Sequence, residues 1–235
     1  MLFSNFLPKL IALNKTCIVV DDGSGKESLG KLRKSLEPHA KFYLIAHQNN
    51  RGKGAAVVTG CHHASAMGFT HFLQIDADGQ HNVDDIAKLL EYSEQHTETI
   101  VCGQPYFDDS APKIRVYGRK LTVFFNAIET LSLKVKDGLC GFRVYPIKAF
   151  EKVIDNHFIG ARMDFDSEFL VKSIWSGVDV KFFPTKVIYH KNTVSHFNYI
   201  RDNHTMIKLH IRLITGMLIR LPYFLYRKIK KSSQP

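Results

Sequence analysis

Short apolar runs alternate along this chain with segments of helical length, and this alternation constrains the fold more than any other feature. The expected strands are 16–20, 42–46, 71–75, 99–102 and 179–183, with another in DGLCGFRVYP at 137–146. The expected helices are 26–36, 53–67, 83–95, 120–133 and 165–175. Strands that alternate with helices predict an α/β fold, and apolar strands without period-2 patterning predict a mostly parallel sheet that is buried on both faces.

Two acidic turns follow expected strands. Asp21-Asp22 comes after the first strand, and Asp76-Ala77-Asp78 comes after the third. Because ligands of parallel sheets bind at the carboxyl ends of the strands, we expect both turns to lie at one binding edge. Carboxylate oxygens at this spacing, with the amide oxygen of Gln80, suit Mg²⁺ or Mn²⁺. The alternative interpretation is that Asp-Gly-rich turns are simply good turns.

Five motifs occur in a recognisable order: IVVDDGSG, NNRGKGAAVVTG, FLQIDADGQH, CGFRVYP and DFDSEFLVKSIWSG. In order and spacing they resemble the family-2 glycosyltransferases of the GT-A fold. The resemblance is strongest to the dolichyl- or polyprenyl-phosphate sugar transferases and their small bacterial relatives in cell-envelope glycolipid synthesis, and it covers about residues 16–190. We therefore expect a GT-A glycosyltransferase domain over 1–198 and a tail over 199–235.

The resemblance implies a donor site for a nucleotide-sugar. Asp21 or Asp22 would contact the base or ribose, and Lys53 would lie near the donor at a Gly-flanked helix start, where free N–H groups favour phosphate. The metal-binding pattern D-x-D-x-Q is matched by three residues that would join the ion to the donor diphosphate: Asp76, Asp78 and Gln80.

The acceptor side matches the family less well. The family uses two arginines about fourteen residues apart; Arg119 matches the second, but Pro105 stands at the place of the first, for which Lys113 or Arg115 are alternatives. Arg143 matches a further family position, and a structural role for it is an equal alternative.

The segment MDFDSE supplies the candidate catalytic carboxylates. The resemblance favours Asp166 or Asp164 as the base that deprotonates a hydroxyl acceptor, with inversion at the anomeric carbon. An acceptor that is already a phosphate monoester needs no base, and these acids would then position groups. Glu168 is more simply a helix-start acid, and His196, a lone histidine, has a role at the diphosphate only as the less favoured interpretation.

The tail is basic and amphipathic. It holds eight of the 32 Lys and Arg residues of the chain and one acid, Asp202. Apolar residues at helical spacing, flanked by basic residues and aromatics, favour a helix in the interface of an anionic membrane; the alternative is a helix packed on the protein's own core. Four scattered cysteines and the lack of an uninterrupted apolar span indicate a cytoplasmic protein, peripheral on the cytoplasmic face of a membrane.

The amino end departs from the family pattern. Family members begin with a strand that ends in a P-x-Y-N-like motif, whereas this sequence begins with an amphipathic helix over about residues 3–13. We expect that the first strand of the domain is missing from this sequence, through a start placed downstream of the true one or a truncated gene.

The predicted function is a metal-dependent inverting transfer of sugar from a UDP- or GDP-sugar to a lipid-linked or envelope acceptor. The alternative is a truncated, weakly active or non-catalytic glycosyltransferase-like protein. A nucleotidyltransferase would need a G-x-G-T-R-like loop near its start, which is absent, and a nucleic-acid partner is disfavoured because the basic charge gathers at one end of the chain.

Overall fold

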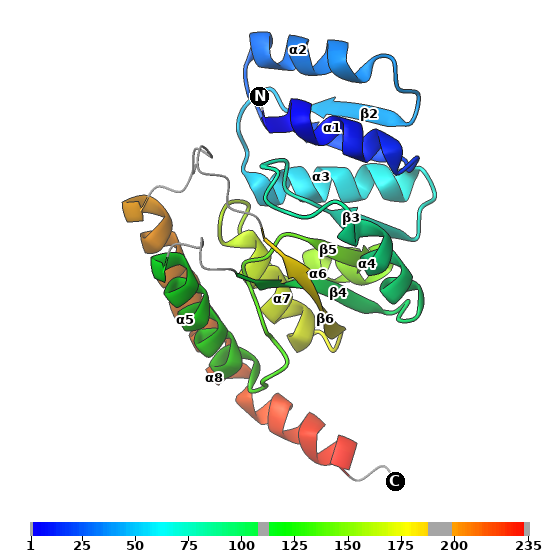
Figure 1. The fold of residues 1–235 in the computed structure, drawn as a ribbon. Helices are drawn as coiled ribbons and strands as arrows, with labels where there is room; N and C mark the ends of the chain where they lie inside the picture. The colour runs from blue at the N-terminus through cyan, green and yellow to red at the C-terminus, as the bar shows by residue number, and fades with distance from the viewer. Residues whose placement is uncertain (1, 108–112, 188–198, 233–235) are drawn as a thin grey trace.

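The computed structural model describes residues 2–107, 113–187 and 199–232 (Figure 1). The strands are β1 Cys17–Asp21, β2 Phe42–Ala46, β3 His71–Gln74, β4 Thr99–Tyr106, β5 Arg143–Pro146 and β6 Asp179–Lys186. The helices are α1 Leu2–Ala12, α2 Lys26–Leu36, α3 Lys53–Ala66, α4 Asp85–Glu94, α5 Lys113–Thr130, α6 Ile147–Asn156, α7 Phe165–Trp175 and α8 Tyr199–Ser232.

The strands form two sheets. β1 and β2 pair in parallel, and a second sheet has the order β3-β5-β4-β6. β4 and β6 are parallel, whereas β5 runs antiparallel to both of its neighbours. The α/β fold is confirmed, with one antiparallel strand inside the larger sheet. β6 continues through Pro184 because it is an edge strand, where a residue without an N–H can be accommodated.

The larger sheet has a helical layer on each face. Ile100 and Cys102 of β4 pack with residues of α3, α6 and α7, whereas Val101 between them packs with α1 and α4. Successive side chains of a strand point to opposite faces, so this division follows from the strand geometry. Both faces being covered explains why the strands are nearly continuous apolar runs.

Several element bounds agree with the sequence prediction, and others do not. α2, β2 and α7 have the predicted bounds. α6 was not predicted, although Ile147, Phe150 and Val153 recur at helical spacing and are buried. α5 begins at Lys113 rather than at residue 120, because Gly118 does not interrupt it: a glycine inside a helix costs about 1 kcal/mol relative to alanine, which a long helix tolerates.

α5 and α8 lie side by side on one flank, and α8 extends past the rest of the molecule (Figure 1). Leu209, Leu213 and Met217 on the inner side of α8 pack with Val171 and Trp175 of α7. This inner face of α8 therefore packs on the protein itself. No helix in the described ranges has the length and hydropathy needed to cross a membrane.

β1 and β3 belong to different sheets, and no described strand joins them. Ile18 and Val19 in β1 are only partly buried, although their apolar run resembles a central strand. Our expectation of a missing first strand stays a prediction.

Candidate functional site

Asp22, at the carboxyl end of β1, holds the start of α3. Its Oδ1 accepts a hydrogen bond from the backbone N–H of Arg51 at 2.9 Å and lies 2.7 Å from Nδ1 of His47, and its Oδ2 accepts the N–H of Gly52 at 2.7 Å. Partial burial raises the pKa of Asp22, but these hydrogen bonds outweigh it and lower the pKa below its usual value. Asp21 is buried and accepts the N–H and hydroxyl of Ser24. Asp21 therefore orders its own turn, whereas Asp22 orders the segment before α3.

Lys53 joins the second acidic turn to α7. Its ammonium group lies 2.8 Å from Oδ2 of Asp76 and 2.6 Å from Oδ2 of Asp166. Burial would lower the pKa of Lys53, but the attraction of Asp166 and Asp76 outweighs it and raises the pKa above its usual range. Because Gly52 binds Asp22 and the next residue binds Asp76, the segment 51–53 brings the two predicted acidic turns to the same edge.

Asp166 is a buried carboxylate with a full set of partners. Besides Lys53, the amide of Gln74 donates to its Oδ1 at 3.1 Å, and Gln74 in turn accepts the hydroxyl of Tyr145 at 3.1 Å. Burial would raise the pKa of Asp166, but Lys53 and Arg143 outweigh it, so the pKa is lowered. The side chain is therefore ionised at neutral pH and held in one position.

The contacts of Arg143 agree with a structural role, which the sequence left as an equal alternative. It is completely buried, and its guanidinium donates to three backbone carbonyls, those of Gly138, Cys140 and Asp166, at 2.8–2.9 Å. A side chain without exposed surface cannot contact a donor substrate directly. Arg143 instead supports the backbone of the 138–140 turn and of Asp166, and its partners are carbonyls rather than the acid of a salt bridge.

Asp78 and Gln80 lie on the turn after β3, and both are partly exposed. The N–H of Gln80 donates to Oδ1 of Asp78 at 3.0 Å, which closes the turn. The described residues contain no cluster of three His, Cys, Asp or Glu side chains arranged for a metal. The oxygen donors of Asp76, Asp78 and Gln80 nevertheless fit a hard cation that takes only one or two carboxylates from the protein.

His81 follows this turn and was missed by the sequence analysis. It is buried and stacks on Phe142 with ring centroids 5.3 Å apart. Among the described residues its Nδ1 has no hydrogen-bond partner. Burial lowers the pKa of the imidazole despite the opposing effect of Asp76 and Asp78. A neutral ring with an unpaired nitrogen beside the acidic turn agrees with a polar or ionic ligand there.

Glycine allows the 138–141 turn to approach the acids closely. A Cβ atom added to Gly141 would lie 2.5 Å from Nζ of Lys53 and 2.9 Å from both carboxylate oxygens of Asp76. Gly52, with φ of 103°, is likewise pressed against the carbonyl of Ala161, at 2.3 Å from an added Cβ. The two glycines let three backbone segments meet around Lys53.

Asp164 and Asp166 are separated by the start of α7. Asp166 pairs with Lys53, which also pairs with Asp76. Asp164 instead lies 3.5 Å from the guanidinium of Arg212 on α8. Glu168 is fully buried and pairs with Lys172 and Arg212, both at 2.6 Å. The structure thus brings only one of the two predicted catalytic acids to the acidic edge.

Arg119 on α5 contacts the residue just before the 138–141 turn. Its guanidinium donates to Oδ2 of Asp137 at 2.6 Å and lies over the ring of Phe107. Asp137 also accepts the N–H groups of Leu139 and Cys140. Lys113 is exposed at the start of α5, the side chain of Arg115 is outside the described set, and His196 falls outside the described residues.

Gln74, Tyr145 and His47 are further residues of this site that the sequence analysis did not select. Gln74 could have been found as a polar residue inside the apolar strand HFLQI. His47 follows β2 as the acids follow β1 and β3. Tyr145 gives no such indication, because an aromatic residue in a strand usually belongs to the core.

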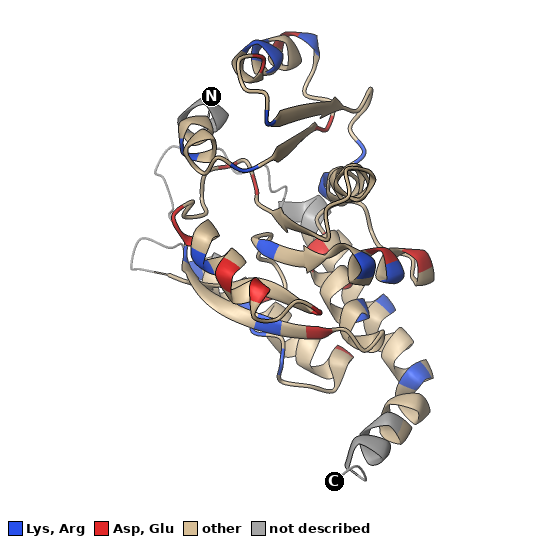
Figure 2. Cartoon of the chain, turned by 90° about the vertical axis from the view of Figure 1, so that its right-hand side faces the viewer, with Lys and Arg blue, Asp and Glu red and all other residues tan. Residues whose placement is uncertain are grey.

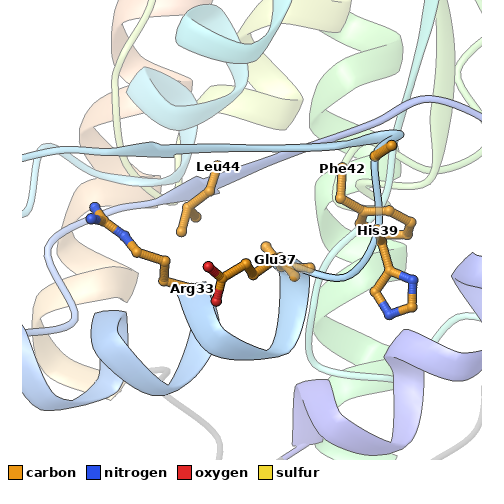
Figure 3. Close-up of a pocket in the computed structure, with 7 residues that line it drawn as sticks. Arg33, Glu37, His39, Phe42 and Leu44 are labelled. Carbon is orange, nitrogen blue, oxygen red and sulfur yellow. The ribbon is translucent and has the colours of Figure 1, made fainter.

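A hollow of about 360 Å³ lies elsewhere, between α2 and β2 (Figure 3). Apolar side chains of Leu36, Phe42 and Leu44 line it together with Arg33 and Glu37. Phe42 is the first and Leu44 the middle residue of β2, and none of the predicted site residues lines the hollow.

Comparison with known proteins identifies the family. The model of the family described as "Glycosyl transferase family 2" matches residues 5–154, which is more than half of the chain. The chain belongs to glycosyltransferase family 2. The resemblance noted in the sequence is thereby confirmed, and this family 2 member is classed as a glycosyltransferase.

Several curated relatives have dolichyl phosphate, a lipid phosphate, in their names. A UDP-N-acetylglucosamine–dolichyl-phosphate N-acetylglucosaminyltransferase of Methanococcus voltae is 28% identical over 84% of this chain and 83% of its own length. A dolichyl-phosphate beta-glucosyltransferase of Trichomonas vaginalis is 32% identical over 66% of this chain and 47% of its own length. The chain thus spans about half the length of the matched beta-glucosyltransferases.

Solved structures agree on the fold. Glucosyl-3-phosphoglycerate synthase of Mycobacterium tuberculosis in complex with UDP superimposes with a TM-score of 0.57 at 13% identity, over 85% of this chain and 68% of that one. A complex of the same enzyme with Mn²⁺, UDP-glucose and glycerol 3-phosphate gives a TM-score of 0.53 at 12% identity, over 89% of this chain and 82% of that one. At this identity the likeness shows a shared GT-A fold.

Proposed function

We propose that this family 2 glycosyltransferase moves a sugar from a nucleotide-sugar, UDP- or GDP-linked, to a lipid-linked acceptor, with a divalent metal ion and with inversion at the anomeric carbon. The observation that carries the proposal is the ammonium group of Lys53 between Asp76 and Asp166, at the edge where Asp22 orders the start of α3. Two acidic turns and a helix start that favours phosphate meet there.

The donor would bind across this edge. Asp21 or Asp22 would contact the base or ribose, and the start of α3 with Lys53 would face the diphosphate. Asp76, Asp78 and Gln80 would hold Mg²⁺ or Mn²⁺. When bound, such an ion acts as a Lewis acid that stabilises the charge of the leaving diphosphate. Arg119, which the Asp137 carboxylate holds at this turn, would bind phosphate on the acceptor side.

The chemistry of Asp166 favours an acceptor that is already ionised. A carboxylate whose pKa is lowered is a weak base, and both of its oxygens already accept hydrogen bonds. A lipid phosphate monoester needs no base: its oxygen attacks the anomeric carbon, and the bond to the nucleoside diphosphate breaks on the opposite side. Asp166 then fixes Lys53. With a hydroxyl acceptor, Asp166 would have to release Lys53 and take the proton.

The names of the curated relatives support the same class of acceptor, since three of those with dolichyl-phosphate in their names match this chain at 28–32% identity. The separation of β1 from β3 is the observation that favours the alternative, a weakly active or non-catalytic protein. The transfer assay below distinguishes the two.

The outer faces of α5 and α8 would bind an anionic membrane surface. Ile114, Tyr117, Leu121 and Phe124 form one exposed stripe on α5, each 56–67% exposed, on the side away from the buried Asn126 that contacts α7. Ile207, Ile211 and Leu218 form a second stripe on α8, opposite the packed Leu209 and Leu213.

The charge around these stripes suits anionic lipid. The one acid on α5, Glu129, is buried, and Asp202 is the one acid in the sequence of α8. Lys113, Lys120 and Lys208 are exposed, and further Lys and Arg positions recur along α8 (Figure 2). We propose a GT-A domain over 1–198 and a membrane-docking tail over 199–235, peripheral on the cytoplasmic face; the charge of the outer faces supports the docking of the tail.

The test is a transfer assay. The protein is mixed with vesicles containing dolichyl phosphate, a panel of UDP- and GDP-sugars and Mn²⁺, and glycolipid products are identified by mass spectrometry. We expect one donor to give a lipid-phosphate sugar product, and Asp78→Asn to reduce the rate at least about tenfold, as expected for the loss of a ligand to a catalytic ion. Absence of product with every donor would contradict the proposal and favour the alternative.

A further inference from the structure

We infer that Arg212 of α8 is a positioning residue for the donor side of the site, so that the tail helix takes part in catalysis through the segment 158–164. This rests on the proposed function. Arg212 contacts one acid of α7 and the acid just before this helix. Its Nε lies 3.0 Å from Oε1 of Glu168 and its second nitrogen 2.6 Å from Oε2, while Asp164 lies 3.5 Å away.

Glu168 also binds the loop before α7, residues 158–164. The carboxylate has no exposed surface, and its Oε2 accepts the N–H of Gly160 at 2.7 Å. Lys172 pairs with the same carboxylate and donates to the carbonyl of Phe158. The guanidinium of Arg212 also lies over the Phe158 ring, 5.4 Å from its centroid. Arg212 and Lys172 together compensate a buried charge that holds the loop.

The loop then contacts the start of α3. The carbonyl of Ala161 accepts the N–H groups of Gly54 at 2.8 Å and Ala55 at 3.3 Å, and Arg162 donates to the side chain of Asn50 at 3.1 Å. Lys53, next to Gly54, bridges Asp76 and Asp166. Three successive contacts therefore connect α8 to the start of α3, next to the group at the centre of the proposed site.

The geometry is specific to an arginine. A guanidinium can make two parallel contacts with one carboxylate and still reach Asp164, whereas a lysine ammonium is a single point of charge. Replacement of Arg212 by lysine keeps Glu168 neutralised but removes the two-pronged contact. A displacement of the loop by an ångström is enough to lower the rate strongly, because catalysis depends on orientation.

Arg220 offers a matched control on the same helix. Its guanidinium lies over the ring of Trp175 at the other end of α7, 4.9 Å from the centroid, and donates to the carbonyl of Gly216. Arg220→Gln therefore removes an arginine that joins α8 to α7 without touching the loop 158–164. Comparison of the two positions separates loop positioning from simple attachment of α8.

The experiment measures transfer kinetics and amide hydrogen exchange for Arg212→Gln, Arg212→Lys and Arg220→Gln. We expect both Arg212 variants to lower kcat, Arg212→Gln by about tenfold, with faster exchange at 158–164 and at Gly54 and Ala55. Arg220→Gln should leave both unchanged. If Arg212→Gln does not fold, Arg212→Lys carries the test, because it keeps a second positive charge beside the buried carboxylate of Glu168.

The inference would be overturned if Arg212→Lys had the same kcat and the same amide exchange as wild type. It would also be overturned if Arg220→Gln changed both as much as the Arg212 variants do. A wild-type protein that transfers no sugar would contradict the proposed function instead. The exchange measurement would then still decide whether Arg212 orders the loop.

Discussion

At the residue scale, the site is organised by charges that compensate one another around Lys53. Acidic residues at strand ends could be selected from the sequence because turns and sheet edges are local features. Their partners could not: Lys53 meets Asp166 across 113 positions of sequence, and Asp164, two positions from Asp166, joins a different network with Arg212. Only packing of α7 against α3 decides which acid faces the site.

The role of Arg143 also could not be decided from the sequence. Its motif CGFR matches the family, yet its guanidinium donates hydrogen bonds to backbone carbonyls in the core. A sequence reports the residue type and the spacing, whereas burial decides whether that residue can meet a ligand. The distinction between a binding arginine and a structural one therefore needs the fold.

The lowered pKa of Asp166 gives a prediction for stability against pH. A carboxylate whose pKa is lower in the folded than in the unfolded state stabilises the fold above its unfolded value, about 3.9, and this contribution is lost as the pH falls through the folded value. We expect Asp166→Asn to be less stable than wild type at pH 7 and the difference to shrink towards pH 2–3, measured as thermal midpoints. Parallel curves for the two proteins would contradict this.

At the scale of elements, periodicity and breakers located most helices and strands. α2, β2 and α7 have their predicted bounds because glycine, proline and apolar spacing mark their ends. The early start of α5 and the presence of α6 were missed because Gly118 and Pro146 look like breakers in the sequence, whereas the structure places them inside a long helix and at an N-cap.

α8 shows how one amphipathic pattern can serve two surfaces. The sequence predicted one apolar face, and the helix has two: Leu209 and Leu213 pack on α7, while Ile211 and Leu218 are 61% and 57% exposed. α5 adds a stripe that the sequence analysis did not foresee. The inner side of α8 agrees with the alternative, packing on the protein's own core, and membrane binding by the outer side stays a prediction.

The outer faces give a prediction for membrane binding. The double variant Ile211→Gln with Leu218→Gln should lose most of its binding to anionic vesicles, at least about tenfold, since each buried apolar side chain is worth about 1.5–3 kcal/mol. Flotation with anionic and zwitterionic vesicles measures it. Thr215→Gln, an exposed polar position of the same helix, is the matched control. Equal flotation of both variants would refute a role for the stripe.

At the scale of the whole molecule, the two acidic turns are distant in sequence and meet through the start of α3. The α/β class, the GT-A fold and the family were predictable because the alternation of strands with helices and the succession of motifs are features of the sequence itself. The division into two sheets and the antiparallel β5 were not, because sheet pairing joins distant segments: His71 of β3 pairs with Pro146 of β5, 75 positions further along the chain.

The central claim, that these two turns form one site for a cation and a nucleotide-sugar, is tested most directly by calorimetric titration of UDP- and GDP-sugars with and without Mn²⁺. We predict that one donor binds only with the metal, that Asp78→Asn weakens this binding at least about tenfold, and that Asp179→Asn, which removes an exposed ion pair with Lys134, does not. Binding of the same donor that survives both chelation of the metal and Asp78→Asn would contradict the account.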